Sequence, residues 1–373
     1  PKERFSTNFS VDVSQSNIQE FGIGFNTSIL ARNIFRGAET LELSGRGNFG
    51  ASRDLSNSED QFLDILEYGA DLRLNFPRII FPFSIQSIIN KRMSPFTSAS
   101  VGFSTQENIG LDRRNLSATF GYRWKPKERR SYQFNLMNVQ FVNNLNVDNF
   151  FNVFRNSYTE LNEIAIPNIG QVNPEFLVGN TEGDFNLIIP QGAEGFINSI
   201  NNGTTRLNVD EQQIANSLLE RKERLTENNL IIASDFVYDY SSRQNIYDEN
   251  FSQFRAKLEW AGNLLSALAK PLGLEQTEAG NYRLFGVQFS QYVKTELNYI
   301  KHWDLGNQRV IATRAYGGIA IPFGNANSIP FPRSFFGGGP NDNRGWRPYD
   351  LGPGSTNAVN DFNEANFKLS FNA

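Results

Sequence analysis

The sequence predicts an all-β protein, a transmembrane antiparallel β-barrel with a large, partly helical extracellular insertion. Aromatic side chains are abundant, with 33 Phe, 12 Tyr and 4 Trp in 373 residues, yet mean hydropathy is only −0.43. No stretch approaches the ~20 consecutive apolar residues of a membrane-spanning helix. Apolar and polar residues instead alternate in many segments, as strands with one lipid face and one wet face require.

Alternation first appears near the start of the chain. Phe5, Thr7, Phe9, Val11 and Val13 alternate with polar residues and predict a first strand over about 5–14. Further alternating segments predict strands near 21–29, 41–49, 66–76, 101–103, 116–124, 132–136, 230–240, 252–261, 284–303, 308–321 and 367–371. The predicted sheet therefore has about twelve strands.

The polar side of these strands suits a water-filled lumen. Charged residues expected to pair there are Arg46, Asp71, Arg73, Lys257, Glu259 and Glu296. Trp124, Trp260 and Trp303 stand near strand ends, as the aromatic girdles of a membrane barrel do. The alternative is a soluble β-sandwich in which the aromatic face forms the core. A single sandwich rarely needs so many long strands, which favours the barrel.

The connections between strands predict the orientation of the barrel. Short turns are expected at 36–38, 125–127 and 306–308, and such turns face the periplasm in outer-membrane barrels. The longest connection, 142–229, predicts a folded extracellular cap because it is rich in Ile and Phe. It includes a predicted helix over Val209–Thr226, opened by Asp210, and a second helical piece is expected over 264–272.

Composition argues against several classes of function. The net charge is −4 and basic residues are scattered, so no nucleic-acid partner is expected. The chain has no cysteine, and its single histidine, His302, stands at a strand end beside Trp303. No Gly-x-Ser-x-Gly elbow, phosphate loop or calcium-loop spacing occurs. The sequence therefore predicts no enzyme, no cofactor and no metal site.

One glycine-rich loop is the candidate functional element. It runs from Ser334 to Trp346 directly after an alternating strand, and three consecutive glycines, Gly337, Gly338 and Gly339, let its backbone fold tightly against a wall. Arg344 is expected to project beside the uncrowded Gly345, with Trp346 fixing the far end of the loop.

Several motifs together resemble a known family. They are the turn Asn33-Ile-Phe-Arg-Gly37, the strand end Ile321-Pro-Phe-Gly324, and the loop motifs Phe335-Phe-Gly-Gly-Gly339, Asn343-Arg-Gly-Trp-Arg347 and Leu351-Gly-Pro353. In these motifs the chain resembles the barrel domain of the BamA/TamA superfamily of outer-membrane assembly factors, and most closely the TamA-like proteins of Bacteroidota.

The resemblance implies a sixteen-stranded barrel preceded by periplasmic POTRA domains. About four strands and the periplasmic region would then lie outside this sequence, which we expect to be a fragment of a longer precursor. The loop over 322–365 would fold into the lumen, where Arg344 would contact carboxylates of the wall. The last predicted strand offers Lys368, Ser370 and Asn372 on that side and no acid, so the partner of Arg344 is not identified.

The resemblance also implies a function in the bacterial outer membrane, namely insertion or translocation of other proteins. Client strands would pair with the first strand at a lateral seam by β-augmentation. The implied partners are the lipid bilayer, client β-barrel or secreted proteins, and periplasmic or inner-membrane assembly subunits. The alternatives are a two-partner-type secretion pore and a passive porin or receptor barrel.

Overall fold

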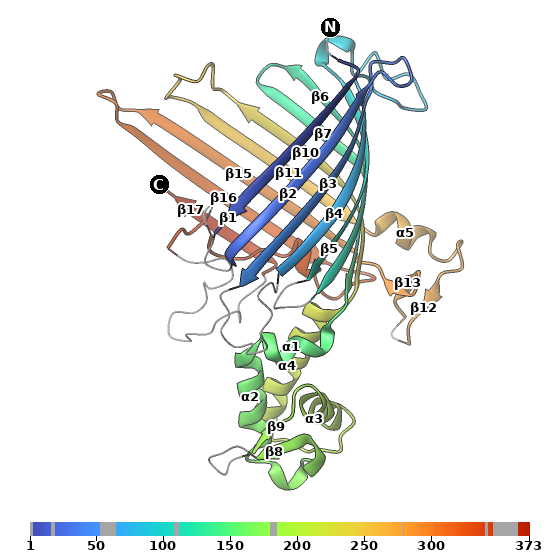
Figure 1. Ribbon diagram of the computed structural model, residues 1–373, viewed down its shortest axis with the longest axis vertical. Coiled ribbons are helices and arrows are strands. Elements are labelled where there is room, and N and C mark those ends of the chain that lie inside the picture. The colour runs from blue at the N-terminus through green and yellow to red at the C-terminus, as the bar shows by residue number, and fades with distance from the viewer. Residues whose placement is uncertain are drawn as a thin grey trace.

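One antiparallel sheet dominates the computed structural model. The structure describes residues 3–15, 19–52, 65–107, 112–179, 185–278, 280–339, 342–345 and 365–373. Twelve strands pair in chain order, and Figure 1 shows them as a curved, tilted wall with a helical unit below one end. They are β1 (Phe5–Ser14), β2 (Gln19–Arg32), β3 (Thr40–Ser52), β4 (Ile65–Phe76), β5 (Phe96–Glu107), β6 (Arg113–Lys127), β7 (Arg130–Asn144), β10 (Asn229–Ser241), β11 (Ser252–Ala261), β15 (Tyr292–Asp304), β16 (Val310–Pro322) and β17 (Phe367–Asn372).

The two faces of the sheet differ in chemistry, as the alternation predicts. On the apolar face the side chains of Leu43, Leu72 and Val101 stand at the same level on three neighbouring strands, and all three are exposed. On the polar face Arg46 pairs with Asp71 at 2.6 Å. Exposed apolar surface on such a scale is unusual for a protein in water but is required of strands that face lipid.

Aromatic rings form a row on the apolar face near one end of the sheet. Trp124 stacks on Tyr132 with ring centres 5.5 Å apart, and Tyr132 contacts Tyr238 at 5.1 Å. We call this end of the sheet the turn end, because compact connections such as 128–129 and 305–309 lie there. The opposite end, which carries the 145–228 connection, is the cap end.

The structure corrects two details of the predicted strands. Residues 125–127 do not form a turn, since β6 continues to Lys127 and the chain reverses at Glu128 and Arg129. The strand predicted over 284–303 begins only at Tyr292. The residues before it belong to a small separate sheet of β12 (Glu275–Gln276), β13 (Tyr282–Leu284) and β14 (Val287–Gln288).

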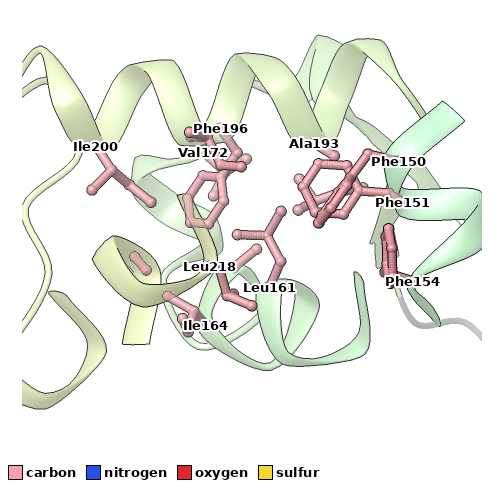
Figure 2. Close-up of a cluster of buried hydrophobic side chains, with 14 of the residues drawn as sticks. Phe150, Phe151, Phe154, Leu161, Ile164, Val172, Ala193, Phe196, Ile200 and Leu218 are labelled. Carbon is pink, nitrogen blue, oxygen red and sulfur yellow. The ribbon is translucent and has the colours of Figure 1, made fainter. Parts of the chain in front are cut away.

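The 145–228 connection folds around its own hydrophobic core, shown in Figure 2. Phe150, Phe196 and Leu161 are fully buried there. Its elements are η2 (Val147–Asn149), α1 (Phe150–Val153), α2 (Arg155–Ala165), η3 (Ile169–Gln171), η4 (Pro174–Phe176), β8 (Leu177–Gly179), β9 (Phe185–Leu187), α3 (Gln191–Asn201) and α4 (Val209–Thr226). We call this unit the cap.

Helix α4 has the predicted bounds but a different start signal. Asn208, not Asp210, is the N-cap, because its side chain accepts the amide hydrogen of Glu211 and its own backbone amide donates to the Glu211 carboxylate. This reciprocal capping box satisfies two amide groups that the helix leaves open. The second predicted helix is α5 (Asn263–Leu268), which is shorter than the predicted 264–272. No helix among the described residues is long and apolar enough to span a membrane.

Candidate functional site

The candidate site is the part of the β16–β17 connection that folds back onto the polar face of the sheet. We call residues 323–339 and 342–345 the docked loop. Ile329 and Phe335 of this loop are buried against Tyr292 and Ala320, which belong to β15 and β16. Phe335 also exchanges two backbone hydrogen bonds with Ala365, at 2.8 and 2.7 Å, just before β17 begins. The loop is thus packed against the wall and is not extended into solvent.

Asn325 fixes the start of the docked loop. Its side-chain amide donates to the carbonyl oxygens of Tyr282 and Phe289 at 3.0 and 2.9 Å, and its side-chain oxygen accepts the amide hydrogen of Tyr282 at 2.6 Å. Its backbone amide donates to the side-chain oxygen of Gln291 at 2.9 Å. The start of the loop is therefore tied to the β11–β15 connection at the cap end.

A buried carboxylate binds the middle of the loop. Glu259 on β11 is 1% exposed, and its carboxylate lies 3.0 Å from Nε of Arg333 in the short helix η5 (Phe331–Arg333). Lys257 lies 2.7 Å from the same carboxylate, and the Tyr292 hydroxyl donates to it at 2.5 Å. A buried carboxylate needs such partners, because an unpaired charge away from water is costly.

Neighbouring side chains on β15 and β16 extend this network. Lys294 donates to the carbonyl oxygen of Arg333 at 2.9 Å, pairs with Glu296 at 3.3 Å and lies 4.2 Å from the centre of the Phe335 ring. The Tyr316 hydroxyl donates to Glu296 at 2.7 Å. Charged groups of the wall therefore hold both the backbone and the aromatic side chain of the loop.

The glycine-rich segment makes a tight bend that positions Asp342. Gly338 and Gly339 have φ angles of 84° and 97°, which residues with a Cβ rarely adopt. The bend lets the Gly338 amide donate to the Asp342 carboxylate at 3.1 Å. Lys368 and Ser370 of β17 donate to the same carboxylate at 2.8 and 2.7 Å. The loop is thus joined to the last strand of the sheet through Asp342.

The environment of Asp342 shifts its ionisation. Burial raises the pKa of its carboxyl, but the hydrogen bonds from Lys368, Ser370 and Gly338 and the charge of Lys368 outweigh that effect. The pKa of Asp342 therefore lies below its ordinary value, and the carboxylate is charged at neutral pH.

The predicted loop residues are placed as follows. Gly337, Gly338 and Gly339 lie in the bend between Phe335 and Asp342. Arg344 and Gly345 are exposed and line a cavity of about 910 Å³ with Asn298, Arg314 and Asn372 of the wall, among others. Trp346 lies outside the described residues. The bracing role of Arg344 stays a prediction.

The predicted seam strand forms one edge of the sheet. Phe5, Thr7, Phe9, Val11 and Val13 all lie in β1 on its apolar face, opposite residues of β2. Among the described residues, β1 pairs only with β2, and β17, at the other edge, pairs only with β16.

Sequence reasoning missed the residues that hold the loop. Glu259 is an inward charge in the prediction, but neither Arg333 nor Asp342 is singled out there. The sequence does contain a signal for one of these contacts. Asp342 is an acid in the loop, and the strand after the loop has Lys368 on its inward face, so an ion pair between them could have been predicted. Among the residues that the structure describes, no group of His, Asp and Glu side chains could hold a metal ion.

Comparison with protein families identifies the sheet and its loop. A family model for the Omp85 superfamily domain matches residues 4–372. The chain belongs to the Omp85 superfamily. No curated protein matches it. Among solved structures, this Omp85 barrel domain is similar to BamA from Haemophilus ducreyi lacking POTRA domains 1–3, with 14% sequence identity and a TM-score of 0.50.

The similarity covers 94% of this chain and 47% of the Haemophilus protein, so the chain spans about half the length of that structure. Membership of the family makes this Omp85 chain a bacterial outer-membrane β-barrel protein. The apolar face of the sheet accordingly faces lipid, and the polar face, which holds the docked loop, faces the lumen.

Proposed function

We propose that this barrel inserts or translocates client proteins at the outer membrane by offering β1 as a template for client strands. The observation that carries the proposal is that β1 is an edge strand among the residues that the structure describes. This strand of ten residues pairs with β2 along its whole length. Such an edge strand presents a row of backbone N–H and C=O groups for a further strand. Addition of a client strand would satisfy those groups without regard to client sequence.

The docked loop supports the same function from the lumen side of the wall. Asp342 joins the loop to Lys368 and Ser370 of β17, and Arg333 joins it to Glu259 of β11. The loop therefore joins strands β11 and β17 and restrains the curvature of this part of the wall. We propose that this restraint keeps the wall in the geometry that client strands require. This function needs no catalytic side chain and no cofactor.

Site-specific disulfide cross-linking tests the template role, since the chain contains no cysteine. Ser10→Cys places a thiol in the middle of β1, and a second cysteine is placed in the terminal strand of a client barrel. In cells that express the complete protein, a disulfide is expected during client assembly. Moving the client cysteine by two residues should move the partner position in β1 by two residues, because the side-chain period of a strand is two.

The matched control is Ser44→Cys on β3. Ser44 faces the same side of the sheet, but β3 is already paired on both sides, with β2 and β4. No client disulfide is expected there. Equal cross-linking at both positions, or client assembly that proceeds with no cross-link at any β1 position, would contradict the template role.

A further inference from the structure

The β4–β5 connection, residues 77–95, departs from the pattern of the turn end. The other connections at that end are 33–39, 128–129, 242–251 and 305–309, all shorter. Residues 77–95 are rich in Ile and Phe, and their charged residues, Arg78, Lys91 and Arg92, are all basic. They contain no regular structure except η1 (Lys91–Met93). A long apolar segment at the end of the barrel where turns are usually short requires an explanation.

Three hydrogen bonds and one ring contact hold this segment against the lipid-facing side of the sheet. Thr97 of β5 donates to the carbonyl oxygen of Arg78 at 2.7 Å and accepts the amide hydrogen of Ile80 at 2.8 Å. The Tyr122 hydroxyl of β6 donates to the carbonyl oxygen of Ile80 at 3.0 Å, and the Phe81 ring packs against the Tyr122 ring at 6.1 Å. Thr97 and Tyr122 are opposite each other in the β5–β6 ladder and are both buried.

These contacts decide on which side of the wall the segment lies. Tyr122 shares its face of β6 with Phe120, whose ring it contacts at 5.4 Å, and with Leu116. Leu116 is exposed, as are its neighbours on the apolar face of β5. The segment therefore covers the outer, lipid-facing surface at the turn end and does not enter the lumen.

The outer surface of the segment is strongly apolar. Phe83 is 75% exposed and Ile88 is 72% exposed, and Ile80 and Phe81 are also exposed. This surface is continuous with the apolar face through Tyr122 and Phe120, and β6 also carries Trp124 of the aromatic row. A group of this many apolar side chains is rarely left exposed to water. The group adjoins the apolar face of the sheet, which the bilayer covers, so lipid can cover the group as well.

We propose that residues 77–95 form an interfacial anchor that lies in the leaflet at the turn end of the barrel. The apolar side chains of the anchor, Phe83 and Ile88 foremost, enter the boundary between headgroups and acyl chains. Arg78, Lys91 and Arg92 lie at the level of the lipid phosphates, with no acidic residue in the segment to oppose them. An apolar surface with basic residues beside it is the composition that binds a membrane interface.

Turn 33–39 stabilises the base of the anchor. Glu39 accepts the backbone amide hydrogens of Phe35 and Gly37 and is fully buried. Burial raises the pKa of Glu39, but these amide bonds and the nearby Arg78 guanidinium outweigh it, so the pKa lies below its ordinary value. The carboxylate is therefore charged and attracts the first basic residue of the anchor.

Fluorescence quenching in vesicles tests the anchor. Phe83→Cys and Ile88→Cys are introduced separately into this cysteine-free chain, labelled with an environment-sensitive fluorophore and folded into vesicles of phosphatidylethanolamine and phosphatidylglycerol. Nitroxide-labelled lipids should quench both labels severalfold more than a label at Glu128→Cys. Aqueous iodide should quench both labels severalfold less than the control label. Glu128 is the control because it is exposed in the two-residue turn between β6 and β7 at the same end.

A charge-neutral variant tests the basic part of the anchor. Lys91→Gln with Arg92→Gln should weaken lipid quenching of the label at residue 88 in vesicles with phosphatidylglycerol and have little effect in phosphatidylcholine vesicles. Heat-dependent gel mobility confirms that each variant is folded. Iodide quenching at residue 83 equal to that at residue 128 in folded protein would overturn the proposal. Shielding that occurs only in native membranes, and not in vesicles, would assign the surface to a protein partner and would also overturn it.

Discussion

At the scale of single residues, Glu259 is the clearest test of how the docked loop is held. Its buried carboxylate is shared by Arg333, Lys257 and Tyr292. Glu259→Gln keeps the shape of the side chain but leaves two cations without their anion. We expect a loss of about 3–5 kcal/mol in the free energy of unfolding, because removing one partner of a buried ion pair leaves the other buried without its counter-charge. Urea unfolding in vesicles, followed by gel mobility of unheated samples, measures this loss.

The matched control is Glu67→Gln. Glu67 lies 3.9 Å from Arg46, and both side chains are well exposed to the lumen. Exposed pairs of this kind contribute less than about 1 kcal/mol. If the two substitutions have equal effects, the network around Glu259 does not hold the loop.

Asp342 gives a prediction about pH. Because its pKa in the folded protein is below the ordinary value of 3.8, the bonds from Lys368 and Ser370 contribute their full stabilisation at pH values above the ordinary pKa. The contribution disappears as pH falls through the lower pKa of the folded state. A fluorophore at Asn343→Cys should therefore keep high anisotropy from about pH 5 to pH 8 and lose it only at pH values below the ordinary pKa of 3.8.

The Asp342→Asn variant with the same label is the comparison. It removes the charge at every pH, so its anisotropy should already be reduced at neutral pH and should change little on acidification. An identical pH profile in the two proteins would show that Asp342 does not fasten the loop to β17.

At the scale of elements, the cap should unfold separately from the barrel. Its buried side chains contact one another, and Phe331 of the docked loop packs against them as a partly buried side chain. Phe196→Ala should destabilise the cap by about 3–5 kcal/mol, because it leaves a cavity at a fully buried position. Protease should then cleave within the cap while the barrel keeps its heat-dependent gel mobility. Val209→Ala, at an exposed position, should leave both unchanged. Loss of barrel folding in Phe196→Ala would contradict this independence.

The elements also show how far sequence reasoning extends. The strands are visible in the sequence because one face meets lipid and the other water, which enforces a period of two residues; β1 was predicted at its observed bounds. Helix α4 was predicted equally well, since its polar and apolar pattern is local. The contacts that hold the docked loop and the 77–95 segment were not predicted, because Asp342 and Tyr122 acquire their partners only through contacts between residues distant in the chain. That the loop folds into the lumen was expected only from the family resemblance. The sequence also placed a turn at Pro126, whereas this residue lies inside β6. A register shift in the pairing of β6 with β7 accommodates the proline, and that pairing cannot be seen in the local sequence.

At the scale of the whole molecule, the two faces of the wall should tolerate charge very differently. Leu72 lies near the middle of β4 on the apolar face, and Leu72→Arg places a cation in lipid. We expect a cost of about 2–4 kcal/mol in the free energy of unfolding. Ser44→Arg places the same cation on the lumen side at the same level, opposite Asp71, and should change stability by less than about 1 kcal/mol. Equal costs measured by urea unfolding in vesicles would contradict the assignment of the two faces.

The narrow base of the cap has a consequence for protein engineering. Strands β7 and β10 are already neighbours where the cap begins and ends, with Val142 opposite Asn229, and Asn144 bonds to Glu227 and Asn228 across the junction. In this register Asn144 stands opposite Glu227, so excision of residues 145–226 would leave two chain ends that a two-residue Asn-Gly turn can join without altering the register of the hairpin. The same junction could accept a foreign domain whose termini lie close together, and the barrel would then carry that domain at its cap end.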